Sequence, residues 1–168
     1  MLEAVKKTFD ILEKQGITRD FLYRNAEQEE QKKFNISLQS ICNRLNINIV
    51  YDDNLVNDKK EKISGYSDVA KRTIFINSSE VGERMRFTLG HELYHILNNQ
   101  NEERNENNKF SEKELNANAF SAELLIPKDI LVRKIDDWGI DVSRLAIYFK
   151  VSIPAMFYRL TNLGFLLK

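Results

Sequence analysis

Apolar positions near the start of the chain recur with the period of an α-helix. In residues 2–15 they fall on one helical face, and Gly16 follows as a stop signal. A second helical stretch starts near Thr18 and becomes very polar, and residues 37–45 again show the helical period. These patterns predict N-terminal helices within residues 1–45.

The pattern then becomes typical of strands. Residues 47–52 and 73–77 are rich in β-branched and aromatic side chains, and each predicts a strand. Residues 61–68 predict a weaker strand that contains Gly65. We therefore expect a small three-stranded sheet.

The helical period returns after the last strand. Apolar positions continue for about three turns up to Leu97, and we expect Asn77 to cap this helix with Glu80 as its capping-box partner. Residues 98–109 are rich in asparagine and glutamate, which predicts an exposed loop.

A further helix is predicted over residues 111–127, with Pro127 ending it. Its apolar positions are Leu115, Ala119, Ala122 and Ile126. Three short helices are expected near 128–137, 141–149 and 153–162.

Together these elements predict an α+β fold in which the sheet packs on the helix that ends at Leu97, with additional helices at both ends. We expect one domain over residues 1–168. It comprises the N-terminal helices (1–45), a central core (46–127) and C-terminal helices (128–168).

The amino-acid composition limits which partners and which cellular location we expect. The 25 Lys and Arg residues balance 25 Asp and Glu residues, so net charge gives no argument for a nucleic acid, a membrane surface or a polyanion as partner. The single cysteine, Cys42, cannot form an internal disulfide, and no run of eighteen apolar residues occurs. We therefore expect a cytoplasmic protein without a membrane span.

The chain's two histidines both lie in residues 86–97, "RFTLGHELYHIL". His91 and His95 are four positions apart, so a helix would place both imidazoles on one face, where they could supply half of a zinc shell. Glu92 is offset by one position and could instead act on water as a general base. The alternative is a helix that carries two histidines by coincidence.

A catalytic zinc site needs a third protein ligand, and here we expect a carboxylate because no further histidine and no second cysteine is available. Glu112, Glu114 and Glu123 are on or next to the following helix. Glu114 is favoured, because the nineteen positions after His95 allow the chain to reverse. Asn118, one turn later, can accept a hydrogen bond from a ligand histidine.

Peptide hydrolysis at such a site would have Glu92 take a proton from water and deliver it to the leaving nitrogen. The tetrahedral oxyanion should need a second donor besides zinc. The sequence offers four candidates and does not choose among them: Tyr94, Tyr148, Tyr158 and Arg159.

The stretch "RFTLGHELYHIL" followed by "ELNANAFSAELLIP" resembles the ImmA/IrrE family of metallopeptidases. Members typically read F-T-x-A-H-E-x-G-H and then E-x-x-A-N-x-F-A-A-E-L-L-M-P. The resemblance implies a compact zincin-like fold with a small sheet above the active-site helix. It also implies one zinc held by His91, His95 and Glu114, with Glu92 as the catalytic base.

The resemblance further implies a substrate class. Relatives cleave DNA-binding transcriptional repressors, of helix-turn-helix type, that guard mobile elements, prophages or stress genes. An extended repressor segment would then pair with a sheet edge beside the cleft. The alternative is a non-catalytic antirepressor or toxin-like module that keeps the fold, but such a module has no chemical need for Glu92.

Two departures from the family pattern matter. Tyr94 replaces the usual glycine before the second histidine, and we expect it to narrow the cleft. Gly90 replaces the usual alanine before the first histidine, which costs a helix about 1 kcal/mol.

The C-terminal helices could be read as a helix-turn-helix. The second of them carries only Arg159 as a basic residue before Lys168, whereas a DNA-reading helix needs several basic or amide groups. Direct DNA binding is therefore disfavoured. We expect this region to complete the core or to dock the repressor.

Overall fold

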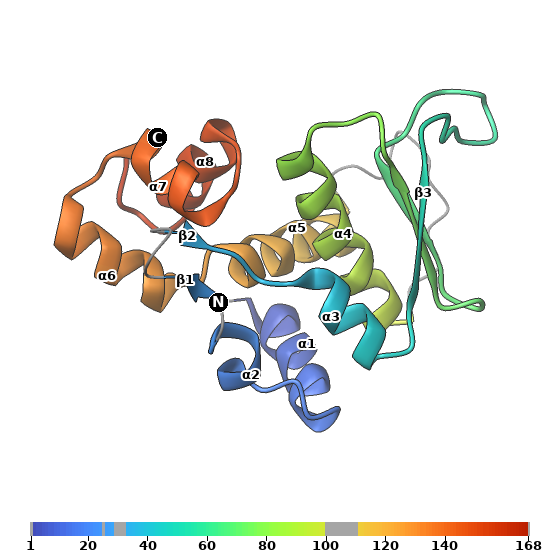
Figure 1. Ribbon diagram of the computed structural model, residues 1–168, viewed down its shortest axis with the longest axis horizontal. Coiled ribbons are helices and arrows are strands. Elements are labelled where there is room, and N and C mark those ends of the chain that lie inside the picture. Colours follow the sequence, from blue (N-terminus) through green and yellow to red (C-terminus); the bar gives the residue numbers. More distant parts are fainter. Residues whose placement is uncertain (1, 25, 29–32, 100–110, 168) are drawn as a thin grey trace.

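The computed structural model describes residues 2–24, 26–28, 33–99 and 111–167 (Figure 1). Within them the elements are α1 (Glu3–Lys14), α2 (Arg19–Tyr23), β1 (Glu27–Gln28), β2 (Lys33–Phe34), α3 (Leu38–Arg44), β3 (Asn48–Asp52), β4 (Gly65–Asp68), β5 (Thr73–Asn77), α4 (Gly82–Leu97), α5 (Glu112–Leu125), α6 (Lys128–Trp138), α7 (Val142–Phe149) and α8 (Ile153–Asn162). The α+β class is confirmed. Most of the predicted loop 98–109 lies outside the described residues.

The predicted three-stranded sheet is present, in the order β3-β5-β4. β3 runs parallel to β5 and pairs Asn48 with Thr73, whereas β4 runs antiparallel to β5 and pairs Gly65 with Ile76. β1 and β2 form a second, two-stranded antiparallel sheet within the stretch that we expected to be helical and then very polar. Two-residue strands are too short to show a period of two.

α4 packs beneath the sheet, and β4 approaches it closely at Gly65. A Cβ at this position would stand 2.6 Å from Thr88 Cγ2 and 2.7 Å from the Phe75 carbonyl oxygen. Only glycine allows this approach without a shift of backbone. The absence of a side chain at Gly65 therefore sets the spacing between the edge strand and the helix that carries both histidines.

The predicted cap of α4 is wrong. The helix begins at Gly82 with Val81 as its N-cap, and no side chain caps it. Asn77 Oδ1 instead accepts from the Ser79 backbone N–H at 3.0 Å, and Glu80 accepts a hydrogen bond from Ser64. Both predicted capping residues thus stabilise the turn between β5 and α4.

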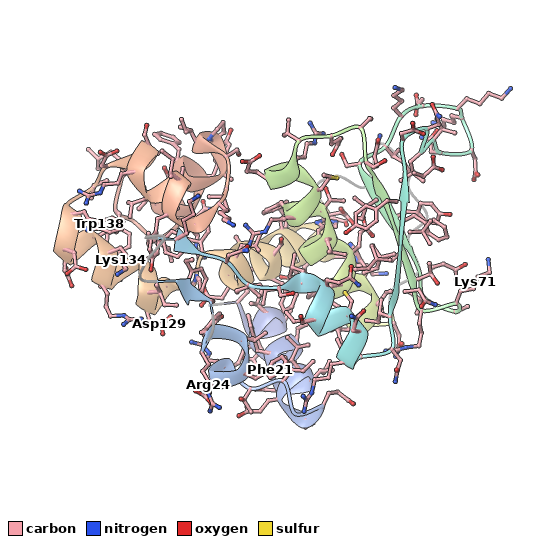
Figure 2. The ribbon with its side chains drawn as sticks, viewed as in Figure 1. Phe21, Arg24, Lys71, Asp129, Lys134 and Trp138 are labelled. Carbon is pink, nitrogen blue, oxygen red and sulfur yellow. The ribbon has the colours of Figure 1, made fainter. Side chains whose placement is uncertain are left out.

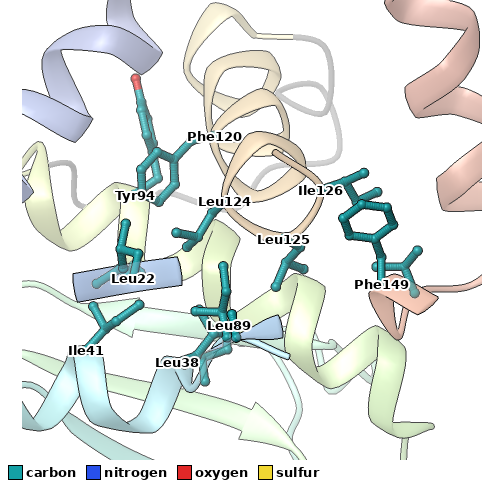
Figure 3. Packing of buried hydrophobic residues seen from close by; sticks show 14 of the residues in the cluster. Leu22, Leu38, Ile41, Leu89, Tyr94, Phe120, Leu124, Leu125, Ile126 and Phe149 are labelled. Carbon is teal, nitrogen blue, oxygen red and sulfur yellow. The ribbon is translucent and has the colours of Figure 1, made fainter. Parts of the chain in front are cut away.

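The core lies between α4, α5 and the N-terminal helices. Figure 3 shows Leu22, Leu38 and Ile41 packed towards apolar side chains of α4 and α5. The predicted apolar face of α5 is wrong in part. Leu115 is 51% exposed, while Ala117, Phe120, Leu124 and Leu125 are the buried apolar residues of the helix. Because α5 is covered by both α4 and α1, its own periodicity does not indicate which side faces inward.

α4 and α5 meet closely at Gly90. A Cβ there would stand 2.6 Å from Ser121 Oγ, which is buried and donates to the Phe87 carbonyl at 2.8 Å. The family pattern has alanine at both positions, whereas this chain has a smaller residue at Gly90 and a larger one at Ser121. The smaller residue at Gly90 and the larger one at Ser121 therefore compensate each other in volume.

Gly90→Ala is expected to lower the free energy of unfolding by about 1 kcal/mol, although alanine is the better helix former. The new methyl group would force the Ser121 hydroxyl to rotate and lose its bond. Combining Gly90→Ala with Ser121→Ala should restore the free energy of unfolding that Gly90→Ala loses. Urea unfolding of the two single variants and the double variant measures the coupling, and strictly additive effects would contradict the compensation.

None of the described helices is both long enough and apolar enough to cross a bilayer.

Candidate metal centre

The two histidines of α4 lie on one face of the helix, as their spacing requires. Their Nε2 atoms are 3.1 Å apart. His95 is fully buried and the His91 side chain is 14% exposed, so access to the pair is from the side of His91. Glu92 lies between them in sequence and is 1% exposed.

α5 brings a carboxylate to both histidines. Glu114 Oε2 is 3.2 Å from His91 Nε2, and Glu114 Oε1 is 3.4 Å from His95 Nε2. The Ser111 hydroxyl caps α5 by accepting from the Glu114 backbone N–H at 3.4 Å. The S-x-x-E spacing of a capping box was a signal for this role of Ser111 that our sequence reasoning missed. Here the glutamate side chain turns to the histidines instead of back to its cap.

Asn118 lies one turn after Glu114 and contacts His91. Its Oδ1 is 2.9 Å from His91 Nδ1. Because an amide oxygen can only accept, this contact places the ring proton on Nδ1 and leaves the Nε2 lone pair directed at Glu114 and His95. The tautomer of His91 is thus set for metal binding.

His91, His95 and Glu114 lie close enough together to share one metal ion. Tetrahedral nitrogen and oxygen ligands at ~2.0–2.1 Å from zinc stand about 3.3 Å from one another. The two histidine Nε2 atoms are 3.1 Å apart, and Glu114 places Oε2 3.2 Å from His91 and Oε1 3.4 Å from His95, so a different carboxylate oxygen is near each ring. Two imidazoles and a carboxylate are also a donor set that catalytic zinc uses, with a fourth position left open. The cluster of His91, His95 and Glu114 could therefore hold a metal.

The sequence also matches a known family of metallopeptidases, as expected for such a cluster. The profile of the Peptidase M78 family, described as the IrrE N-terminal-like domain, matches residues 42–161. The chain belongs to the IrrE N-terminal-like family. Membership suggests peptidase activity and a metallopeptidase-type regulator of transcription.

Solved structures share the fold of this IrrE-like domain. A Mycobacterium tuberculosis transcriptional regulator superposes with a TM-score of 0.64 at 14% sequence identity. The match covers 98% of this chain but only 48% of that chain, so the domain spans about half the length of this similar protein. No curated protein gives a significant match to the sequence.

Tyr94 does not narrow the cleft of this IrrE-like domain, and that expectation is wrong. Its side chain is 2% exposed and packs against the Phe120 ring of α5, with ring centroids 5.8 Å apart (Figure 3). Its ring also meets that of His95 edge-on at 5.7 Å. Tyr94 thus fills the space between α4 and α5 and supports His95 from the core side.

The structure places Arg159 at a different site. Its Nη2 donates to Glu123 and to the Ile126 carbonyl, so it joins α8 to the end of α5. Glu123 also pairs with Arg19 at 3.7 Å. Because Glu123 is nine positions after Glu114, it points about half a turn away around α5. Of the three carboxylates considered as the third ligand, the structure brings Glu114 to the histidines, while Glu123 faces Arg159.

Tyr148 and Tyr158 lie in the C-terminal helices, away from the trio. Tyr148 is 5% exposed and packs edge-on against Trp138 at 5.2 Å, with the Lys134 ammonium 5.1 Å from the Tyr148 ring centroid. Figure 2 shows Lys134 and Trp138 together on α6. Tyr158 is 67% exposed on α8. The structure thus places Tyr148 in an aromatic cluster, and its role as an oxyanion donor stays a prediction.

Asn118 is predicted to tune metal affinity through His91. Asn118→Ala should weaken zinc binding by about 10- to 100-fold, because His91 loses the acceptor that fixes its tautomer and orientation. Asn118→Asp keeps an oxygen at this position and should retain most of the affinity. Competition titration with a chromogenic chelator distinguishes the two variants, and equal affinity for Asn118→Ala and wild type would contradict the role.

Proposed function

We propose that this protein is a zinc-dependent endopeptidase that cleaves a DNA-binding transcriptional repressor at one site in the cytoplasm, relieving repression of a mobile element, a prophage or stress genes. The cluster of His91, His95 and Glu114, a donor set that could hold zinc, is the observation that supports catalysis most directly. Family membership supports the peptidase class. The repressor as substrate rests on the resemblance to the ImmA/IrrE family.

His91, His95 and Glu114 would hold the zinc, and Asn118 would orient His91. When bound there, zinc supplies a Lewis acid that polarises a carbonyl and lowers the pKa of water. Glu92 accepts the proton from the attacking water and delivers it to the leaving amide nitrogen, which restores the carboxylate. Burial of Glu92 and His95 keeps bulk water away from this proton transfer.

The edge of β4 would bind the substrate backbone. In the described sheet β4 pairs with β5 on one side only, and β4 also lies against α4. An extended repressor segment could add to that edge as a further strand, which would bring its peptide bond near the helix that carries Glu92. This arrangement favours an unfolded or extended stretch of the repressor over a helical one.

The test is co-expression with the helix-turn-helix repressor encoded nearest the gene, followed by mass spectrometry of the intact masses. We expect two fragments whose masses sum to that of the repressor plus one water. They should be absent with Glu92→Gln. If the repressor stays whole but its DNA binding is relieved equally by wild type and Glu92→Gln, the protein acts as a non-catalytic antirepressor and the proposal is wrong.

A further inference from the structure

A concave site lies on the side of α4 that faces away from His91. A groove of about 590 Å³ opens between the first turns of α4, the sheet and the junction of α7 with α8. Figure 1 shows α7 and α8 opposite the first turns of α4. Its α4 residues Met85, Arg86 and Leu89 point about 120° to 160° around the helix axis from His91. The groove is therefore separate from the metal centre, although both use the same helix.

The walls of the groove are apolar and unusually exposed. Ile147 is 68% exposed, Ile153 54% and Tyr51 55%. Phe157, 47% exposed and one turn after Ile153, extends the apolar strip along α8. Large aliphatic and aromatic side chains that gather on one surface are typical of protein docking sites, whereas isolated exposed ones need no explanation.

The groove is also locally positive. Lys33, Arg86 and Lys150 line it against one carboxylate, Glu83, in a chain whose formal net charge is zero. Arg86 Nη1 donates to the Lys150 carbonyl at 2.9 Å, and its Nη2 is buried without a hydrogen-bond partner among the described residues. Carbonyl dipoles do not neutralise a guanidinium, so its charge adds to the field of the two lysines.

From these features we infer that the groove docks an acidic amphipathic helix of a partner protein. Apolar side chains at i, i+3 or i+4 and i+7 would lie against Ile147, Ile153 and Tyr51, and flanking carboxylates would meet Lys33 and Lys150. The partner would stay outside the metal cleft. It would contact the rear of the helix that carries His91 and Glu92, at the point where Arg86 joins that helix to α7.

A defined peptide pair tests this inference with the zinc-loaded full chain. The probe is a capped amphipathic helix of about 15 residues with leucines on one face and glutamates beside them, and its matched control has lysines in place of the glutamates. Isoleucine methyl NMR reports the site. We expect the glutamate peptide to shift Ile76, Ile147 and Ile153, and to bind at least about tenfold more tightly than the lysine peptide.

Ile147→Gln combined with Ile153→Asp should weaken the glutamate peptide by at least about tenfold, because both anchors of the groove become polar. Both positions are exposed, and an acid at the first residue of α8 suits its N-terminus. Ile140→Gln, at a 45% exposed position outside the groove, is the control and should bind as wild type does.

Three results would overturn the inference. The two peptides could bind equally, the shifts could fall on methyl groups away from the groove, or the double variant could bind as wild type does. Shifts of the same methyl groups with protein concentration alone would instead assign the groove to a second copy of the chain. None of these results bears on whether the metal centre cleaves a repressor.

Discussion

Glu92→Gln is expected to bind zinc as wild type does and to cleave the repressor about 10²- to 10⁴-fold more slowly. Glutamine has nearly the volume of glutamate, so the buried position next to His91 stays filled. It cannot accept a proton at neutral pH, and the attacking water and the leaving nitrogen both lose their proton partner. The loss should therefore appear in kcat, with KM nearly unchanged.

Purified zinc-loaded protein and purified repressor give the clearest measurement, with metal content determined in the same samples. Glu112→Gln is the matched control, because Glu112 is exposed on the neighbouring helix α5 and lies in neither the metal cluster nor the groove behind α4. Cleavage by Glu92→Gln at the wild-type rate would exclude Glu92 as the base. A variant that folds but no longer holds zinc would instead make Glu92 a support of the metal centre.

Glu114→Ala should weaken zinc binding by more than about 100-fold, since loss of a ligand should exceed the 10- to 100-fold cost of losing a residue that supports one. The carboxylate contacts both histidines, at 3.2 and 3.4 Å, so its removal also takes away the one acidic side chain of this cluster. Cleavage should be lost with the metal.

Zinc competition titration measures this effect, and Glu112→Ala, two residues earlier on α5 and exposed, is the control. Zinc should raise the melting temperature of wild type and of Glu112→Ala but not that of Glu114→Ala at the same concentration. An unchanged zinc affinity in Glu114→Ala would mean that the metal is held elsewhere, and the predicted third ligand would be wrong.

The histidine pair could be anticipated from sequence because its geometry is local. Residues four apart on a helix share a face whatever surrounds them, and the structure brings His91 and His95 within 3.1 Å of each other. Glu114 is a longer-range contact. It could be anticipated because few residue types can complete such a cluster and because the helix after the histidines offers few carboxylates.

Contacts between side chains that are far apart in sequence could not be predicted in the same way. Tyr94 is buried because Phe120, twenty-six positions later, covers it, and no local pattern indicates that pairing. Asn77 fits a helix cap by residue type, but its side-chain amide donates to the Ile63 carbonyl at 3.0 Å instead. In both cases the position of the side chain depends on a contact with a residue that is distant in sequence. Such a contact can be seen only once the fold is known.

The three proposed ligands come from two helices. The stability of the folded protein would therefore depend on how much metal is available. An ion held by α4 and α5 would cross-link them, and binding to the folded state alone adds about 2.7 kcal/mol when free zinc is 100 times its dissociation constant. That is a large share of the stability of an ordinary domain. When zinc is scarce, the same molecule would lose activity and become easier to unfold and degrade. The amount of protein in the cell would then depend on zinc as well as on its synthesis.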